Sequence, residues 1–151
     1  MSLAAIDSAR AMRFVLDNSV VMRWLLQDGS AERLLYAQRI LNLLADDANH
    51  AVVPNIWPLE VANVIAKAQA KGLLTEARAA AFIGLLNDMA IAIDTKTAAQ
   101  ALGDTLQLAR RFGLSSYDAA YLELALREGL PLATLDADLQ NAYLHTGGVL
   151  V

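Results

Sequence analysis

Short apolar runs alternate with longer segments of helical periodicity along this chain. The run Phe14–Leu16 is rich in β-prone residues and stops at the charged Asp17. Four later runs are of similar length, and none of them alternates strictly between apolar and polar positions. Continuous apolar runs predict strands that are buried on both faces of a parallel sheet. The predicted strands are residues 14–17, 51–54, 89–93, 130–135 and 148–151.

Between these runs, apolar residues recur at helical spacing, and residues that cap or end helices stand at the boundaries. The predicted caps are Ser19, Thr75 and either Ser115 or Ser116, and the predicted helix ends are marked by Gly72, Gly113 and Gly129. The predicted helices are residues 20–27, 31–45, 58–71, 76–87, 97–112 and 117–128, with a short one after Asp136.

Helices between consecutive strands imply crossover connections, which join parallel strands. The chain is therefore predicted to be a three-layer α/β/α protein with a central, mostly parallel sheet of about five strands. The first strong apolar run follows Met12, so residues 1–12 are expected to be a peripheral segment and residues 13–151 a single domain. In open sheets of this kind, ligands bind beyond the carboxyl ends of the strands.

The composition narrows the class of protein. Of the 151 residues, 56% are hydrophobic and 19% are charged, which predicts a sizeable core rather than disorder. No apolar stretch reaches the ~18–20 residues needed to cross a bilayer, so no membrane contact is expected. The absence of cysteine excludes disulfides and thiolate metal sites and fits a cytoplasmic location. The formal charge of -4 argues against a broad basic surface that holds nucleic acid.

Several common motifs are absent. The chain has no G-x-G-x-x-G, no phosphate-binding G-x-x-x-x-G-K-[ST] and no G-x-S-x-G of serine hydrolases. His50 and His145 have no second histidine at metal-ligand spacing and are expected to be ordinary surface residues. Carboxylates are therefore the remaining candidates for chemistry.

Two aspartates follow predicted strands. Asp17 ends the first apolar run, and Asp136 comes directly after the run 130–135. If the two strands are parallel, both carboxylates lie at the same edge of the sheet. The alternative is structural, because Asp17 could cap a helix and Asp136 could begin one.

Asp118 lies on the apolar side of its predicted helix. At ~100° per residue, Tyr121 and Leu122 project on its own side, whereas Glu123 and Arg127 project away from it. A buried, unpaired carboxylate is costly and needs a cation, a proton or hydrogen-bond donors. The structural alternative is a first-turn aspartate that the helix dipole favours.

Glu60 is ambiguous by its pattern. Asn63, Lys67 and Lys71 follow it on nearly the same helical face. Periodicity alone favours a solvated polar stripe for this face.

Four segments carry a family resemblance in their order and spacing. They are Phe14-Val15-Leu16-Asp17-x-Ser19, Leu59-Glu60-Val61-x-Asn63, Ser115-x-Tyr117-Asp118-Ala119-Ala120-Tyr121 and Leu132-Ala133-Thr134-x-Asp136-x-x-Leu139. From Met12 to Val151, the chain resembles the PIN-domain family, and most closely the VapC-type toxins of bacterial toxin–antitoxin pairs.

The resemblance implies a single PIN-like nuclease domain and a metal-dependent endoribonuclease. The acidic quartet of the family carries over as Asp17, Glu60, Asp118 and Asp136, which implies that these residues bind Mg²⁺ or Mn²⁺ and catalyse hydrolysis. Asp138 is a nearby rival of Asp136, but the Thr-x-Asp register favours Asp136. The residues that would support the quartet by hydrogen bonds are Ser19, Asn63, Ser116 and Thr134.

Partners also follow from the resemblance: an RNA substrate, a VapB-type antitoxin and a second copy in a homodimer. Candidate protein-binding surfaces are the helices 20–27 and 31–45, although core packing is the more common role for their apolar residues. Those residues are Trp24, Leu34, Leu35, Tyr36 and Leu41, and the candidate RNA contacts are Arg23, Lys67, Lys71, Arg110 and Arg111.

Two other functions stay open. The chain could be a catalytically inactive PIN-like module that binds a protein, or a metal-dependent phosphatase. The Asp-x-Asp-x-[Thr/Val] motif of aspartate-nucleophile phosphatases is absent at residues 17–19.

The net charge has a different meaning on this interpretation. Without the proposed quartet, 12 acidic residues balance 12 Lys and Arg, so the whole deficit lies in the candidate site. RNA is then expected to bind weakly in the absence of a divalent ion.

Overall fold

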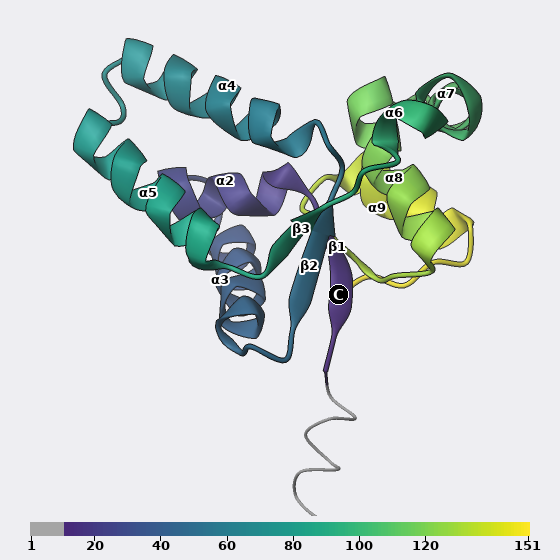
Figure 1. The fold of residues 1–151 in the computed structure, drawn as a ribbon, viewed down its shortest axis with the longest axis horizontal. Helices are drawn as coiled ribbons and strands as arrows, with labels where there is room; N and C mark the ends of the chain where they lie inside the picture. Colours follow the sequence, from purple (N-terminus) through teal and green to yellow (C-terminus); the bar gives the residue numbers. More distant parts are fainter. Residues whose placement is uncertain (1–10) are drawn as a thin grey trace, which may run out of the picture.

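A computed structural model describes residues 11–151, so the expectation for the peripheral segment 1–12 lies almost entirely outside the described residues. The described chain forms a four-stranded sheet in the order β3-β2-β1-β4, and every pairing is parallel (Figure 1). The strands are β1 (Arg13–Leu16), β2 (His50–Val53), β3 (Ile91–Ile93) and β4 (Leu132–Ala133).

Helices cover both sides of this sheet, which confirms the three-layer α/β/α architecture. Figure 1 shows α2 to α5 on one side of the strands and α6 to α9 on the other. The first group is α2 (Asn18–Leu26), α3 (Ala31–Ala45), α4 (Trp57–Ala70) and α5 (Glu76–Asp88). The second group is α6 (Thr97–Gln100), α7 (Leu106–Phe112), α8 (Ser116–Glu128) and α9 (Ala137–His145).

The sheet is smaller than expected at its β4 edge. Only Leu132 and Ala133 form β4, and the predicted strand 148–151 is reduced to a single bridge between Leu132 and Leu150. The turn after α9 explains this, because the Gly148 N–H is still bonded to the Tyr143 carbonyl of that helix. The sheet therefore has four strands and one bridge rather than about five strands.

The strand predicted over 89–93 was expected to be buried, and this was wrong. β3 lies at an edge of the sheet, and Ile93 is 48% exposed. An edge strand has a neighbour on one side only, so its apolar side chains are covered incompletely.

The helix predicted over 97–112 is interrupted. A π-helical segment, Ala101–Thr105, separates α6 from α7, and Gly103 has non-helical angles of φ -105° and ψ -108°. Glycine lacks a Cβ and tolerates such angles better than other residues. Local periodicity predicted the two flanking helices but not the break between them.

The core lies around the two central strands. Phe14, Val15 and Leu16 of β1 are completely buried, as expected for a strand with helices on both faces. Because all strands are parallel, their carboxyl ends meet at one edge. Among residues 11–151, no helix is long and apolar enough to cross a membrane.

Candidate active site

The ends of β1 and β4 bring the first candidate residues together. Leu16 pairs with Ala133, and the Asp17 N–H donates to the Ala133 carbonyl at 2.9 Å. The next residues, Asp17 and Thr134, therefore leave the sheet side by side. Asp17 is only 4% exposed, and the Thr134 hydroxyl donates to its Oδ2 at 2.8 Å.

Ser19 was expected to cap the helix predicted over 20–27. In the structure, Asp17 occupies the cap position and Ser19 lies in the first turn of α2. The Ser19 hydroxyl donates to Asp17 Oδ2 at 2.6 Å and accepts the Leu135 N–H at 3.0 Å. The reason is tertiary: a hydroxyl that could have capped a helix instead joins the ends of β1 and β4.

Asp136 is fixed in the same network. Its backbone N–H donates to Thr134 Oγ1 at 3.0 Å, and its Oδ1 accepts the Leu139 N–H at 2.9 Å. Asp136 is therefore the N-cap of α9 as well as a carboxylate at the edge of the sheet. The structural and the chemical interpretations of this residue are compatible.

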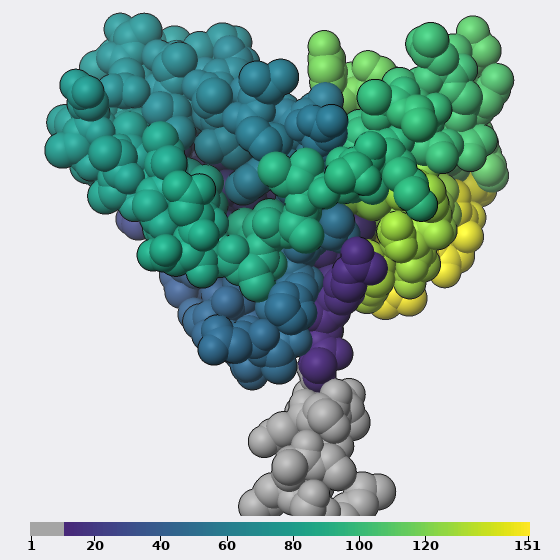
Figure 2. Space-filling view, viewed as in Figure 1, coloured from purple at the N-terminus to yellow at the C-terminus, as the bar shows by residue number. Residues whose placement is uncertain are grey.

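Glu60 and Asp118 come from the first turns of two helices. Glu60 is half-buried in α4, and its Oε1 accepts a hydrogen bond of 2.6 Å from the Tyr121 hydroxyl of α8. Asp118 is half-buried in α8, where its N–H donates to the capping Ser115 hydroxyl at 3.1 Å. Figure 2 shows the surface notched between α4 and the segment of α6 to α8.

Burial and mutual repulsion both disfavour the charged forms of these acids. Burial raises the pKa of Asp17, the charge of Asp118 raises it further, and the hydrogen bonds from Ser19 and Thr134 oppose the rise. Burial also raises the pKa of Glu60, with further contributions from the charges of Asp17 and Asp118. The Tyr121 hydrogen bond acts in the opposite direction on Glu60.

Asp118 is affected in the same way. Burial raises its pKa first, and the neighbouring charges of Asp136 and Asp138 add to the increase. Asp17, Glu60, Asp118 and Asp136 therefore interact through space although they lie far apart in the sequence. Within residues 11–151, none of the four makes an ion pair with a basic side chain.

The donor set suits a hard divalent cation, because carboxylate oxygens are the ligands that Mg²⁺ and Mn²⁺ prefer. As the side chains stand, no three acidic or histidine residues of the described chain are close enough to hold one ion. Like charges repel, so uncompensated carboxylates lie apart, and a cation favours a closer arrangement. Asp17, Glu60, Asp118 and Asp136 fit such an ion by their chemistry and by their common edge.

Comparison with known proteins agrees with this geometry. The profile of the PIN domain matches residues 14–144, which is most of the chain. The chain belongs to the PIN-domain family. A curated relative, Ribonuclease VapC3 of Pyrobaculum aerophilum, is 30% identical over 132 residues, a span of 87% of this chain and 95% of the relative.

Two solved structures show the same PIN fold. The crystal structure of PAE2754 from Pyrobaculum aerophilum has a TM-score of 0.62 and 21% identity, and covers 93% of this chain and 85% of its own. VapBC2 from Rickettsia felis, bound to a DNA fragment from its promoter, has a TM-score of 0.62 and 14% identity. That match covers 93% of this chain and 98% of its own.

Not every predicted supporting residue lies against the acids of this PIN domain. Thr134 and Ser19 both contact Asp17 directly. Asn63 and Ser116 are exposed, and no hydrogen bond within the described chain joins them to an acid. The polar stripe predicted for α4 holds for Asn63, Lys67 and Lys71, which are exposed, but not for Glu60.

Tyr121 was placed by the sequence on the apolar side of its helix, and it is completely buried. Sequence reasoning missed its role as a hydrogen-bond donor to Glu60. The available signal was a hydroxyl on a buried helix face, since buried hydroxyls need a partner.

A second acidic cluster was also missed. Glu123 and Arg127 were expected on the solvated side of α8, but Glu123 is 4% exposed and pairs with Arg127 at 2.7 Å. Arg127 also contacts Asp94, which follows β3, at 2.7 Å. We call Asp94, Glu123 and Arg127 the ion-pair cluster.

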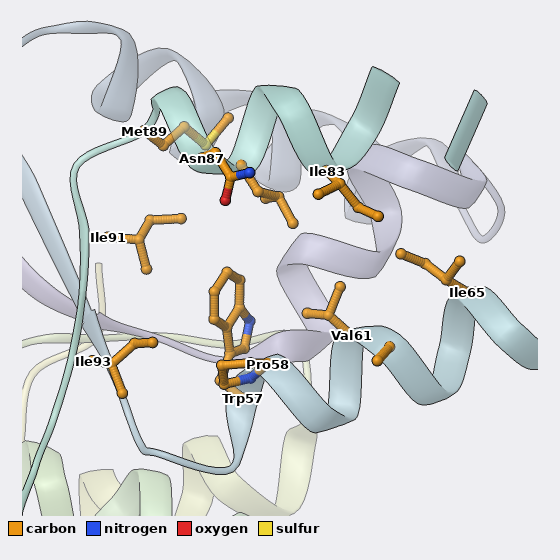
Figure 3. A pocket seen from close by; sticks show the side chains of 11 residues that line it. Trp57, Pro58, Val61, Ile65, Ile83, Asn87, Met89, Ile91 and Ile93 are labelled. Atoms are coloured by element: carbon orange, nitrogen blue, oxygen red, sulfur yellow. The ribbon is translucent and has the colours of Figure 1, made fainter. Parts of the chain in front are cut away.

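An apolar hollow beside α4 is not lined by any member of the candidate active site. It has a volume of about 360 Å³ and lies between α4, α5 and β3. Figure 3 shows the Trp57 indole between Val61 and Ile91 in this hollow. No acidic residue lines it, so it is not part of the candidate active site.

Proposed function

We propose that this chain is a metal-dependent endoribonuclease that acts as the toxin of a type II toxin–antitoxin pair. The observation that carries the proposal is the group Asp17, Glu60, Asp118 and Asp136, whose charges influence one another and which form no ion pair with a basic side chain of residues 11–151. Hereafter we call these four residues the acidic quartet. An acidic site of this kind repels RNA unless a divalent ion compensates its charge.

Each member of the acidic quartet has a distinct proposed role. Asp17, Asp118 and Asp136 would hold Mg²⁺ or Mn²⁺, and Glu60 would orient the attacking water. The bound ion supplies a lower pKa for that water and compensates charge that develops on the phosphate. Ser19 and Thr134 hold the Asp17 carboxylate in place through its Oδ2. The expected products are a 3′-hydroxyl and a 5′-phosphate.

The relatives support the proposal without establishing it for this chain. The PIN family and the 30% identity with a protein named as a ribonuclease favour nuclease chemistry. Neither of the other two functions, an inactive binding module and a phosphatase, accounts equally well for four uncompensated carboxylates at one edge.

The direct test is Mg²⁺-dependent cleavage of structured RNA by the purified protein. Asp118→Asn should fold normally and lose at least about 100-fold in activity, because it removes one ligand charge of the metal. Asp47→Asn is the matched control, since Asp47 is exposed and precedes β2, at the opposite end of that strand from the candidate site. Equal activity of Asp118→Asn and wild type would overturn the proposal.

Asp136 and Asp138 are distinguished by the same assay. Asparagine is as good an N-cap as aspartate, so Asp136→Asn keeps the start of α9 but removes the charge. Asp136→Asn should abolish cleavage, whereas Asp138→Asn should leave it measurable. Hydrolysis of a small phosphate ester in place of RNA would instead favour a phosphatase.

The proposed partners are a VapB-type antitoxin and a second copy of the chain, in the cytoplasm. The candidate surface on α2 and α3 contains a hollow of about 540 Å³. The residues that line it include Trp24, Leu34, Leu35 and Leu41. Leu35 is 71% exposed at this hollow, so its side chain is accessible to a partner. Leu35→Glu should weaken antitoxin binding and spare RNA cleavage. Light scattering would measure the oligomeric state.

A further inference from the structure

A second hollow of about 400 Å³ lies between the end of α7 and the outer face of α9. Both helices pack against α8, the helix that carries Asp118 (Figure 1). The hollow is lined by Arg111, Phe112, Asp138, Asn141, Ala142 and His145. None of these residues belongs to the acidic quartet.

One lining residue of the hollow, Asp138, is close enough to the acidic quartet for its charge to act on Asp118. Asp138, Asn141 and His145 are three and seven residues apart along α9, so they share one helical face. Asp138 lies two residues after Asp136, and its charge reaches Asp118. An extended ligand that runs along this face of α9 would pass from Asp138 to His145.

The far end of the hollow combines a cation with an aromatic ring. The Arg111 guanidinium carbon lies 4.8 Å from the centre of the Phe112 ring. His145 meets the same ring edge-on, with ring centres 5.9 Å apart. Arg111 and His145 are both exposed, and neither makes an ion pair within residues 11–151.

This chemistry matches one class of ligand. Single-stranded nucleic acid is bound by cations that contact its phosphates and by aromatic or guanidinium planes on which bases stack. An acidic peptide would use the cation but not the stacked planes. The lining therefore favours a nucleotide over a peptide.

We propose that the hollow between α7 and α9 is a subsite for an RNA nucleotide next to the scissile phosphate. Arg111 contacts the phosphate of that nucleotide, and Phe112 and His145 provide the surface on which its base stacks. This inference rests on the proposed ribonuclease function, since it extends the same substrate beyond the acidic quartet.

The test compares Arg111 of α7 with Arg78 of α5, which was not among the candidate RNA contacts. Arg111→Gln removes a cation that lines the hollow, and Arg78→Gln removes an equal charge from an exposed residue that does not line it. With a short single-stranded RNA of mixed sequence, Arg111→Gln should raise the KM for cleavage about tenfold and change kcat by less than about twofold. Arg78→Gln should change KM by less than about twofold.

A binding measurement tests the nucleotide subsite separately from the ribonuclease function. Fluorescence anisotropy of the same RNA, labelled and in the presence of Ca²⁺, measures affinity without cleavage. Arg111→Gln should lower the RNA affinity about tenfold. Phe112→Leu keeps an apolar side chain and should weaken binding as well. Absence of cleavage by wild type would contradict the ribonuclease proposal alone. Equal RNA affinity of the Arg111 and Arg78 variants would overturn the subsite.

Discussion

Two groups of buried acids in this chain differ in how their charge is compensated. In the ion-pair cluster, Asp94 and Glu123 both contact the Arg127 guanidinium at 2.7 Å. In the acidic quartet, the nearest polar partners are neutral hydroxyls, such as Tyr121 for Glu60. Asp17 of one group and Glu123 of the other are both 4% exposed, so burial alone does not distinguish the groups.

The pKa values of the acids differ between the ion-pair cluster and the acidic quartet. Burial would raise the pKa of Asp94, but the Arg127 hydrogen bonds outweigh this effect and hold the pKa below its usual value. Burial raises the pKa values of Asp17, Glu60 and Asp118, and no basic side chain of residues 11–151 forms an ion pair with them. A buried acid with its own arginine is structural, whereas a group of acids without one is expected to bind a cation from solution.

The largest expected effect comes from removing Arg127, the cation that compensates Asp94 and Glu123. Arg127→Met should lower the free energy of unfolding by about 3–5 kcal/mol, because Asp94 and Glu123 would be left buried without a cation. Urea unfolding monitored by circular dichroism measures the loss, with Arg110→Met as a surface control. A loss no larger than that of the control would show that the ion-pair cluster is not compensated by Arg127.

Divalent ions should act on the acidic quartet alone. At a free Mn²⁺ concentration of about 100 times Kd, wild type should gain about 2.7 kcal/mol of stability. Asp118→Asn should lose most of this gain, and Asp94→Asn should keep it, although its starting stability is lower. Thermal unfolding with and without Mn²⁺ measures the difference. An equal response of the two variants would mean that the ion does not distinguish the two groups.

The Tyr121 hydroxyl is expected to hold Glu60 ready for the ion. Tyr121→Phe keeps the buried ring but removes the donor, so the pKa of Glu60 should rise further. Mn²⁺ affinity should fall about fivefold, or about 1 kcal/mol. Isothermal titration calorimetry measures the affinity. Tyr143→Phe removes a buried hydroxyl that bonds to the Leu130 carbonyl instead, and it should leave the affinity unchanged.

The smallest effect is on stability without metal. A carboxyl whose pKa is higher in the folded chain than in the unfolded chain binds its proton more tightly when folded. Stability should therefore rise as the pH falls toward the folded pKa of Asp118. At neutral pH, Asp118→Asn should be more stable than wild type by about 0.5 kcal/mol, allowing for solvent screening of a half-exposed group.

Thermal unfolding across the acid range checks the sign of this effect. The advantage of Asp118→Asn should shrink as the pH falls, since wild type then takes up its proton. Asp94→Asn should instead be less stable than wild type at neutral pH. This deficit should shrink as the pH falls, because the contribution of a carboxyl with a lowered pKa is lost. A constant difference at all pH values would contradict the electrostatic assignment.

Much of the fold could be predicted from local patterns. Apolar runs indicated the strands, and serine, threonine and glycine marked helix ends, as Thr75 and Gly129 do. The break at Gly103, the exposed edge of β3 and the reduction of the last strand to a bridge could not be predicted. These three features depend on which elements become neighbours, and periodicity within one element does not contain that information.

The acidic quartet was less accessible to local reasoning. Asp17 and Asp136 could be predicted because each stands at the end of an apolar run, and parallel strands end at one edge. Glu60 could not, since its helical face is otherwise a solvated polar stripe. Only the resemblance to PIN domains indicated it, and in the folded chain it is distinguished by the Tyr121 hydroxyl.

By itself, the sequence determined the order of strands and helices and the places where carboxylates end strands or begin helices. These features depend on backbone preferences and side-chain periodicity over a few residues. The tertiary structure decided which acids are compensated: Glu123 is paired by Arg127, and Glu60 is not paired by any cation of the described chain. Charge compensation depends on distance through space, which is fixed only when β3, α4 and α8 pack together.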